Sequence, residues 1–469
     1  MRTSPLRSLF SRLVVELICI SFMLPLLTAA PARARTKNRP QPPSPTQISS
    51  PSAASDNFKF GKVDLELLDQ VNLLDKRLER EGLVLEEDAA NAYLKRIGEV
   101  LVPPAEQLEN VSWRFRALRD PQPNAFALPN GSIYVTTGLM SLVDNESQLA
   151  AVLAHEMTHV LRRHTYLQNR SNRKKFLTMN IIAAVGAYAP GGVVGAVITI
   201  ATTIAPLIVI ATIFGYSREL EREADLKGID MMIKAEYAPE EMVNVMKLLN
   251  KDIEGENIRL FYNDHPSLDE RLKYLSNYLG ARADKVTSQM ELNREQGAYF
   301  HQMEPVMRHD IQLAINEGRF RSAVYLAQRL VDLHPDSENV FWLAESYRTL
   351  GPRRSQLTDK ELTNSAKKDA AKKREKRTIE EEERDLLTTP DGQQEAKMHQ
   401  QKAEELYLRA LSLDNPAPVA HRGLGMLYEK SGRQVEALNE YEKYLALAPA
   451  SIDRERIQKR IENLRRSAQ

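Results

Sequence analysis

One helical segment, residues 147–161, restricts the fold more than any other part of this 469-residue sequence. Its residues are apolar or uncharged with one exception, Glu156, which lies between His155 and His159. Burying a carboxylate without a compensating partner is costly, so an ordinary core helix would not carry this composition. The segment therefore predicts a buried polar site, and a metal ion would resolve the cost.

The spacing of the two histidines favours a shared ion. Residues four apart lie on one face of a helix with Cβ atoms roughly 5–6 Å apart, so His155 and His159 can both reach an ion at ~2.1 Å. Zinc suits imidazole ligands, and we expect one Zn²⁺ per subunit. Glu156 cannot easily reach the same ion but can touch a water there, which predicts the role of general base.

A catalytic zinc usually has three protein ligands and one open position, so a third ligand is needed. Glu221 is the preferred candidate, because Asp225 follows one turn later and could orient a histidine; a solvated acidic face is the alternative. Glu223 is expected on a different face. His164 lies five residues after His159 without the glycine that returns metzincin chains to the metal, so we expect an exposed histidine at a helix end.

The surrounding pattern predicts a mainly helical region with a small sheet. Apolar residues recur at helical spacing over 62–102, whereas 113–118 and 133–136 have the composition of strands. A helix is expected over 146–163, with Asn145 as its N-cap and a glutamine three residues later that can reach back to the cap.

The N-terminus is typical of an exported protein. Residues 1–34 place arginines before an apolar run and small residues after it, which predicts a cleaved signal peptide; an uncleaved anchor is the alternative, because Glu16 interrupts the run. The only cysteine, Cys19, lies there, so we expect no disulfide in the mature chain. We also expect no lipid attachment, because Glu16, Leu17 and Ile18 are not the small residues that would precede a lipid-modified cysteine. Residues 35–57 are rich in proline and serine and predict a disordered linker.

A long uncharged stretch, 176–216, has two interpretations. It is either a hydrophobic hairpin that covers the site or touches a bilayer, or a single span over 193–214 that Pro206 would interrupt. A span would make the protein an integral membrane enzyme. We favour the hairpin, because a span must keep the motifs on both sides of it on one face of the membrane.

The C-terminal third contains a repeat with a period of 34 residues. Alanine, tyrosine and leucine recur at this interval, as Ala403, Tyr407 and Leu411 and then Ala437, Tyr441 and Leu445. The period and marker residues are those of tetratricopeptide repeats, which are stacked pairs of helices. We therefore predict a domain with the zinc site over 58–290 and a repeat domain over 291–469, with a charged, solvated insertion over 352–396.

The charge balance excludes one class of partner. Lysine and arginine number 64 against 63 aspartates and glutamates, so the whole chain offers no field that would attract nucleic acid. We expect polypeptide partners and no nucleic acid.

Four motifs follow one another along residues 124–271: NAFALPNGSIYVTTGLM, LAAVLAHEMTHVLRRH, SRELEREAD and HPSLDER. In this order they resemble the gluzincin peptidases that include the CAAX prenyl endopeptidase and the Oma-type proteases. With the predicted signal and repeats, the chain is similar to the periplasmic β-barrel assembly-enhancing proteases of Gram-negative bacteria. The resemblance implies a mainly α fold, in which a gluzincin domain with a small β-sheet precedes an α-solenoid.

The resemblance also implies residue roles. Carried over by position, it makes the two motif histidines and Glu221 zinc ligands, with Asp225 as a partner behind them. It implies that the strand over Asn124, Ala125 and Phe126 is an edge that pairs with extended substrate. His265 would face the zinc, either closing the site at rest or steadying the oxyanion during turnover.

The implied activity is hydrolysis of unfolded or stalled polypeptides in the periplasm. Outer-membrane proteins and their assembly machinery are the implied clients, the repeats would dock partners, and peripheral membrane contact is compatible with the apolar stretch. The alternative is a chaperone or adaptor whose protease activity His265 keeps gated.

Overall fold

The computed structural model describes residues 58–86, 88–102, 108–171, 216–249, 268–280, 296–353 and 378–467. The predicted signal peptide and linker, His265, all but the last residue of 176–216 and most of the charged insertion lie outside these ranges. The described chain is mostly helical, with one three-stranded mixed sheet. Of the helices in these ranges, none combines the length and the low polarity that a bilayer crossing requires.

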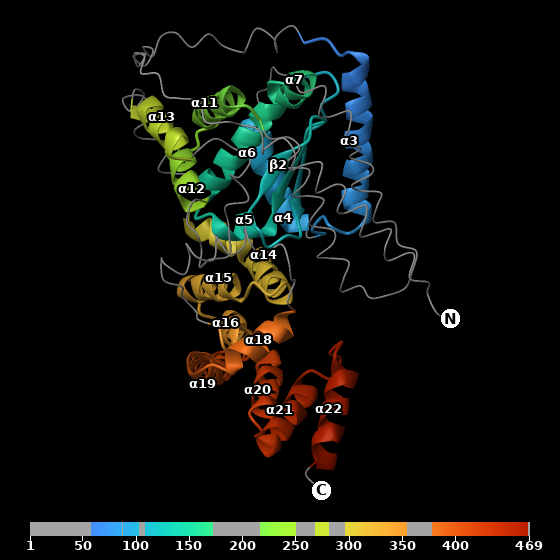
Figure 1. Ribbon diagram of the computed structural model, residues 1–469, viewed down its shortest axis with the longest axis vertical. Helices are drawn as coiled ribbons and strands as arrows, with labels where there is room; N and C mark the ends of the chain where they lie inside the picture. Colours follow the sequence, from blue (N-terminus) through green and yellow to red (C-terminus); the bar gives the residue numbers. More distant parts are fainter. Residues whose placement is uncertain are drawn as a thin grey trace, which may run out of the picture. The chain divides into compact units, whose positions relative to one another are not determined.

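The predicted N-terminal helical region forms two helices, α3 (Lys62–Arg80) and α4 (Asp88–Leu101) (Figure 1). One face of α3 packs its leucines against the sheet, and Asp75 on that face is buried. The Asp75 carboxylate accepts hydrogen bonds from the hydroxyls of Tyr134 and Ser132, the latter at 3.1 Å. These bonds satisfy a charge that would otherwise be costly to bury and fix α3 to the sheet.

The sheet confirms both strands predicted from composition, and it contains the short edge strand that the resemblance implied. Strands β1 (Arg114–Leu118), β2 (Ala125–Ala127) and β3 (Ser132–Thr136) lie in the order β1-β3-β2. β1 runs parallel to β3 and β2 runs antiparallel to it, so β2 is at an edge. Gly131 has a φ of 95° in the β2–β3 turn, and a Cβ there would lie 2.7 Å from the Ser112 carbonyl oxygen, so the turn needs glycine.

The predicted metal-binding helix is α6 (Glu146–Leu161), which follows the short helix α5 (Thr137–Leu142). As predicted, Asn145 is its N-cap: the side-chain oxygen accepts from the Gln148 N–H at 2.9 Å. The Gln148 side chain reaches one residue further back than predicted and accepts from the Asp144 N–H at 2.8 Å.

Helix α6 lies at the centre of the N-terminal core, because other helices cover most of its surface. It packs against β2 and α4 and against α11 (Arg218–Lys234) and α12 (Glu241–Leu249), which lie beside it in Figure 1. Gly228 lets α11 approach α6 closely, since a Cβ there would lie 3.3 Å from the backbone nitrogen of His155. Helix α13 (Leu268–Gly280) packs against α11 and α12.

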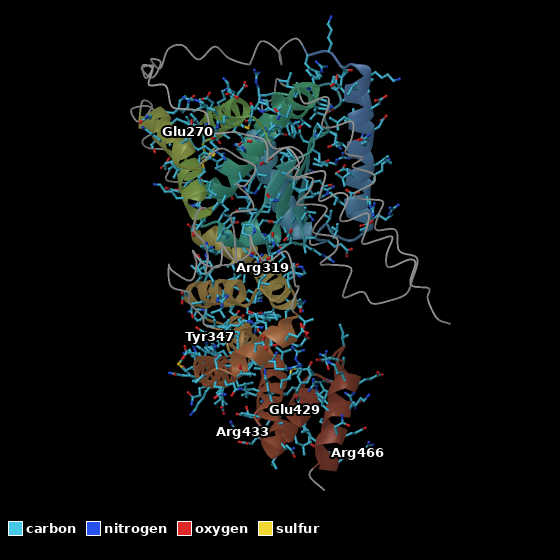
Figure 2. All side chains as sticks on the ribbon, in the orientation of Figure 1. Glu270, Arg319, Tyr347, Glu429, Arg433 and Arg466 are labelled. Carbon is cyan, nitrogen blue, oxygen red and sulfur yellow. The ribbon has the colours of Figure 1, made fainter. Side chains whose placement is uncertain are left out.

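The C-terminal part is a succession of helices, most of which pack on the next in the chain. They are α14 (Gln296–Asn316), α15 (Phe320–Leu333), α16 (Ser337–Leu350), α18 (Ile379–Leu387), α19 (Pro390–Ser412), α20 (Val419–Lys430), α21 (Gln434–Leu447) and α22 (Arg454–Ser467). The repeat tyrosines are buried, and small residues make room for them: a Cβ at Gly423 would lie 2.3 Å from the Tyr407 ring. Glu429, labelled in Figure 2, accepts from Tyr441 at 2.6 Å and Arg460 at 2.7 Å, which joins α20, α21 and α22. The tetratricopeptide assignment stays a prediction.

Arg329 connects α15 to the end of α5 and to the residues that lead into α6. Its guanidinium donates to the carbonyl oxygens of Ser141 at 3.0 Å and Val143 at 2.9 Å, and to the Asp144 carboxylate at 2.8 Å. The two carbonyl acceptors lie at the C-terminal end of α5, where the last carbonyls of a helix have no partner within the helix. The guanidinium supplies that partner. Helix α14 also packs on α5, so the core continues across the predicted domain boundary.

Candidate metal centre

The structure brings three predicted ligands together from two helices. The Nε2 atoms of His155 and His159 on α6 lie 3.1 Å apart. Glu221 on α11 places its carboxylate oxygens 3.5 Å from the first and 3.7 Å from the second. A tetrahedral ion ~2.1 Å from each ligand would put the ligand atoms ~3.4 Å from one another, so the spacing fits zinc.

The chemistry of the donor set also fits a cation. All three side chains are buried, and Glu221 has no exposed surface at all. A carboxylate in this position is costly unless positive charge compensates it. Two imidazoles and one carboxylate that converge within 4.8 Å could hold a metal ion and leave a fourth position open.

Asp225 holds His155 from behind, at the position predicted for it. Its Oδ1 lies 2.9 Å from Nδ1 of His155, which leaves Nε2 of that ring for the metal. Burial opposes the ionisation of Asp225, but Arg271 and His155 outweigh burial and hold the pKa of the carboxyl well below its usual range.

Arg271 is a site residue that our reasoning from helical spacing missed. It is almost fully buried and donates to both oxygens of Asp225, at 2.9 and 2.7 Å; the Tyr274 hydroxyl also donates to this carboxylate. Its Nη1 lies 3.7 Å from the Glu221 carboxylate. The only sequence signal was its place as the last residue of the HPSLDER motif.

The prediction of an exposed His164 was wrong. The side chain is fully buried, and its Nδ1 lies 3.0 Å from Nδ1 of His159. The reason is the backbone of Arg163, whose φ of 57° ends α6 two residues earlier than predicted and turns the chain into α7 (His164–Ser171). Burial lowers the pKa of His164.

Tyr216 covers the other side of this histidine pair. Its ring stacks on the His159 imidazole, with ring centroids 3.9 Å apart and an interplanar angle of 14°. Its hydroxyl lies 2.8 Å from that of Thr165 on α7. Burial raises the pKa of the Tyr216 phenol, so this side chain stays neutral. Its stacked ring restricts rotation of the His159 ring.

Glu156 faces the ligands from the same helix as the histidines. Burial, and then repulsion from the Glu221 carboxylate, raise the pKa of Glu156 well above its usual value. The backbone N–H of Ala127 donates to its carboxylate and acts in the opposite direction. The edge strand β2 therefore lies directly against the predicted base.

The register of β2 refines the predicted substrate edge. The Asn124 carbonyl oxygen accepts from the Thr136 N–H at 2.9 Å. Leu128, two residues after Phe126, donates its backbone N–H to β3 again. Because successive residues alternate, the backbone groups of Asn124 and Phe126 point into the sheet, whereas those of Ala125 and Ala127 face the edge. Phe126 also buries its ring against Tyr134. The backbone groups of Asn124 and Phe126 therefore already pair with β3, whereas those of Ala125 face the edge; substrate binding by these three residues stays a prediction.

Comparison with known proteins places this geometry in a family context. Residues 88–279 match the model of Peptidase family M48. Residues 88–279, the M48 segment, contain all three candidate ligands together with Glu156 and Asp225, and they end before α14. This match supports a metalloprotease.

The two relatives described next are a metalloendopeptidase and a protease by name. The chain is 28% identical over 210 residues to the mitochondrial metalloendopeptidase OMA1 of Saccharomyces cerevisiae, covering 41% of this chain and 54% of that protein. It is 25% identical over 180 residues to the beta-barrel assembly-enhancing protease of Escherichia coli, covering 37% and 35%. The chain thus spans between about a third and a half of the length of these relatives.

Proposed function

We propose that the chain is a zinc-dependent endopeptidase. The observation that carries the proposal is the convergence of two imidazoles from α6 and one carboxylate from α11 beside a buried glutamate on α6. Zinc bound there would supply Lewis acidity toward a water molecule and toward the scissile carbonyl. The M48 match supports the same reaction class.

The chain's own residues divide the remaining work. Glu156 would accept a proton from the attacking water and later pass it to the leaving amine, which needs a carboxylate held near the reacting atoms. Ala125 offers its outward backbone groups to an extended polypeptide, and Ala127 offers its carbonyl, because the Ala127 N–H reaches Glu156; the substrate must therefore be locally unfolded. Asp225 keeps the His155 ring in place, and Arg271 does the same for the Glu221 carboxylate.

Clients and location are part of the proposal. The proposed clients are unfolded or stalled outer-membrane proteins, and the proposed location is the periplasm. The signal-like N-terminus and the bacterial relatives named for β-barrel assembly support both. The OMA1 relatives are named as mitochondrial, so the relatives' names support two compartments, and the signal-like segment favours export. The C-terminal helices would dock partners.

A chaperone or adaptor role is the second candidate, because the C-terminal helices form an extended packed series beyond the M48 segment. Glu156→Gln separates the two roles, since it removes the base and leaves every ligand. We expect the variant to bind zinc, to lose cleavage of unfolded casein and to lose support of client assembly. If assembly survives while casein cleavage is abolished, docking is the primary function.

A further inference from the structure

The two histidine ligands are held by different chemistry. His155 has the carboxylate of Asp225 behind it, which is the usual arrangement for a ligand histidine. Behind His159 lies another imidazole, that of His164, with the two Nδ1 atoms 3.0 Å apart. Two facing ring nitrogens form a hydrogen bond only if one of them carries a proton and the other does not.

Glu223 decides which nitrogen carries the proton. Its carboxylate accepts from the Arg162 guanidinium at 2.8 Å, and its other oxygen lies 3.4 Å from Nε2 of His164. A carboxylate at this position favours a proton on Nε2, because a bare ring nitrogen would face it with a lone pair. Nδ1 of His164 is then the acceptor, and it must receive the N–H of Nδ1 from His159.

We propose that His164 is a positioning residue that sets the tautomer of His159. The hydrogen bonds run in series from Arg162 through Glu223 and His164 to His159. They leave Nε2 of His159 without a proton, so its lone pair is available on the atom that lies 3.1 Å from Nε2 of His155. This inference rests on the proposed zinc site but assigns a role to residues outside the ligand set. His164 is not itself a ligand in this arrangement, because its Nδ1 meets the side of His159 opposite the facing Nε2 pair.

The test compares zinc dissociation constants of His164→Phe and His164→Asn with that of the full-length wild-type protein, by chelator competition. We expect the phenylalanine variant to weaken zinc binding ~10–100-fold, which is the cost of losing a partner behind a ligand. Asparagine can place an amide oxygen near the position of Nδ1 and should recover most of the affinity. The visible spectrum of the Co²⁺-substituted protein should change in His164→Phe and return toward wild type in His164→Asn.

A matched control is His421→Phe, which breaks another histidine–glutamate bond, the one to Glu440 at 2.6 Å, outside the M48 segment. It should leave zinc affinity unchanged. Should His164→Phe fail to fold, Glu223→Leu gives the same readout from the next member of the series. Wild-type affinity in either folded variant overturns the inference, whereas a wild-type protein without zinc overturns the proposed function instead.

Discussion

Arg271 is the residue on which the electrostatics of the site depend. It is a buried cation that lies close to two buried carboxylates, Asp225 and Glu221, and it donates two hydrogen bonds to the first. Removing one member of a buried ion pair costs more than the pair contributes, because the remaining charge stays desolvated.

We therefore predict that Arg271→Leu lowers the free energy of unfolding by ~3–5 kcal/mol and weakens zinc binding. Urea unfolding and chelator competition measure the two effects. In the double variant with Asp225→Asn, the Asp225 charge is absent and only that of Glu221 remains, so the second substitution should cost less than it does alone. Additive losses in this cycle would contradict the pairing.

The backbone N–H of Ala127 gives a second prediction at this scale. Ala127→Pro removes the donor that reaches Glu156, and proline is tolerated where an edge-strand N–H faces away from the sheet. We expect folded, zinc-loaded protein with casein cleavage reduced at least ~10-fold. Ala125→Pro is the comparison, because it removes an outward N–H that would pair with substrate but does not reach Glu156, so its loss should appear in KM and that of Ala127→Pro in kcat. The same kcat in the two variants would speak against a role of Ala127.

Residue chemistry was only partly predictable from the sequence. The histidine pair and Glu156 follow from helical spacing and from the cost of a buried charge. His164 was misjudged because the left-handed turn at Arg163 has no clear signal in a non-glycine residue. Arg271 lies in another helix, and periodicity along the sequence cannot show which distant helix supplies a counterion.

Among the elements, the contact between α14 and α5 contains an unusual buried acid. Asp310 on α14 accepts from the Thr137 hydroxyl at 2.8 Å, and Asp120, Glu317 and Arg319 are the other charged groups that act on it. Burial raises the pKa of Asp310 to about 7, against the opposing effects of Thr137 and Arg319, the latter labelled in Figure 2.

An acid whose pKa rises on folding holds a proton in the folded state, so the fold loses stability as pH climbs from about 4 to about 7. Asp310→Asn keeps the acceptor for Thr137 and removes this loss. We expect the variant to be more stable than wild type by ~1–3 kcal/mol at pH 8, with a smaller difference at pH 5. Urea unfolding at both pH values measures the change. A difference that does not depend on pH would contradict the account.

Element positions were the most predictable level, since the strands and the N-cap of α6 agree with the sequence patterns. The break in the N-terminal helical region and the short strand β2 were not predicted from periodicity, because three residues are too few to show a period. The alternation of β2, which decides which backbone groups reach the edge, depends on its pairing with β3.

For the whole molecule, the main finding is that the hydrophobic core does not stop at the predicted domain boundary. Tyr299, Met303 and Val306 on α14 are buried in the same core as Leu139 and Met140 of α5. The sequence predicted two domains from composition and repeats, and neither signal reports which surfaces the domains share.

We accordingly predict that a chain ending at residue 295 is insoluble or unfolded, although it retains every proposed ligand. Its α5 would expose apolar surface that α14 covers in the full protein. Solubility and far-ultraviolet circular dichroism test this, with the full-length protein as control. A soluble, helical, zinc-binding fragment would show that the M48 segment folds independently of α14.

The central claim is that α6 and α11 together hold a zinc ion, and metal analysis tests it most directly. Purified wild-type protein should contain one zinc per chain, and His155→Ala with unchanged helical content should contain almost none. A correctly folded wild-type protein that carries no zinc, and stays inert toward unfolded casein when zinc is added, would contradict the account.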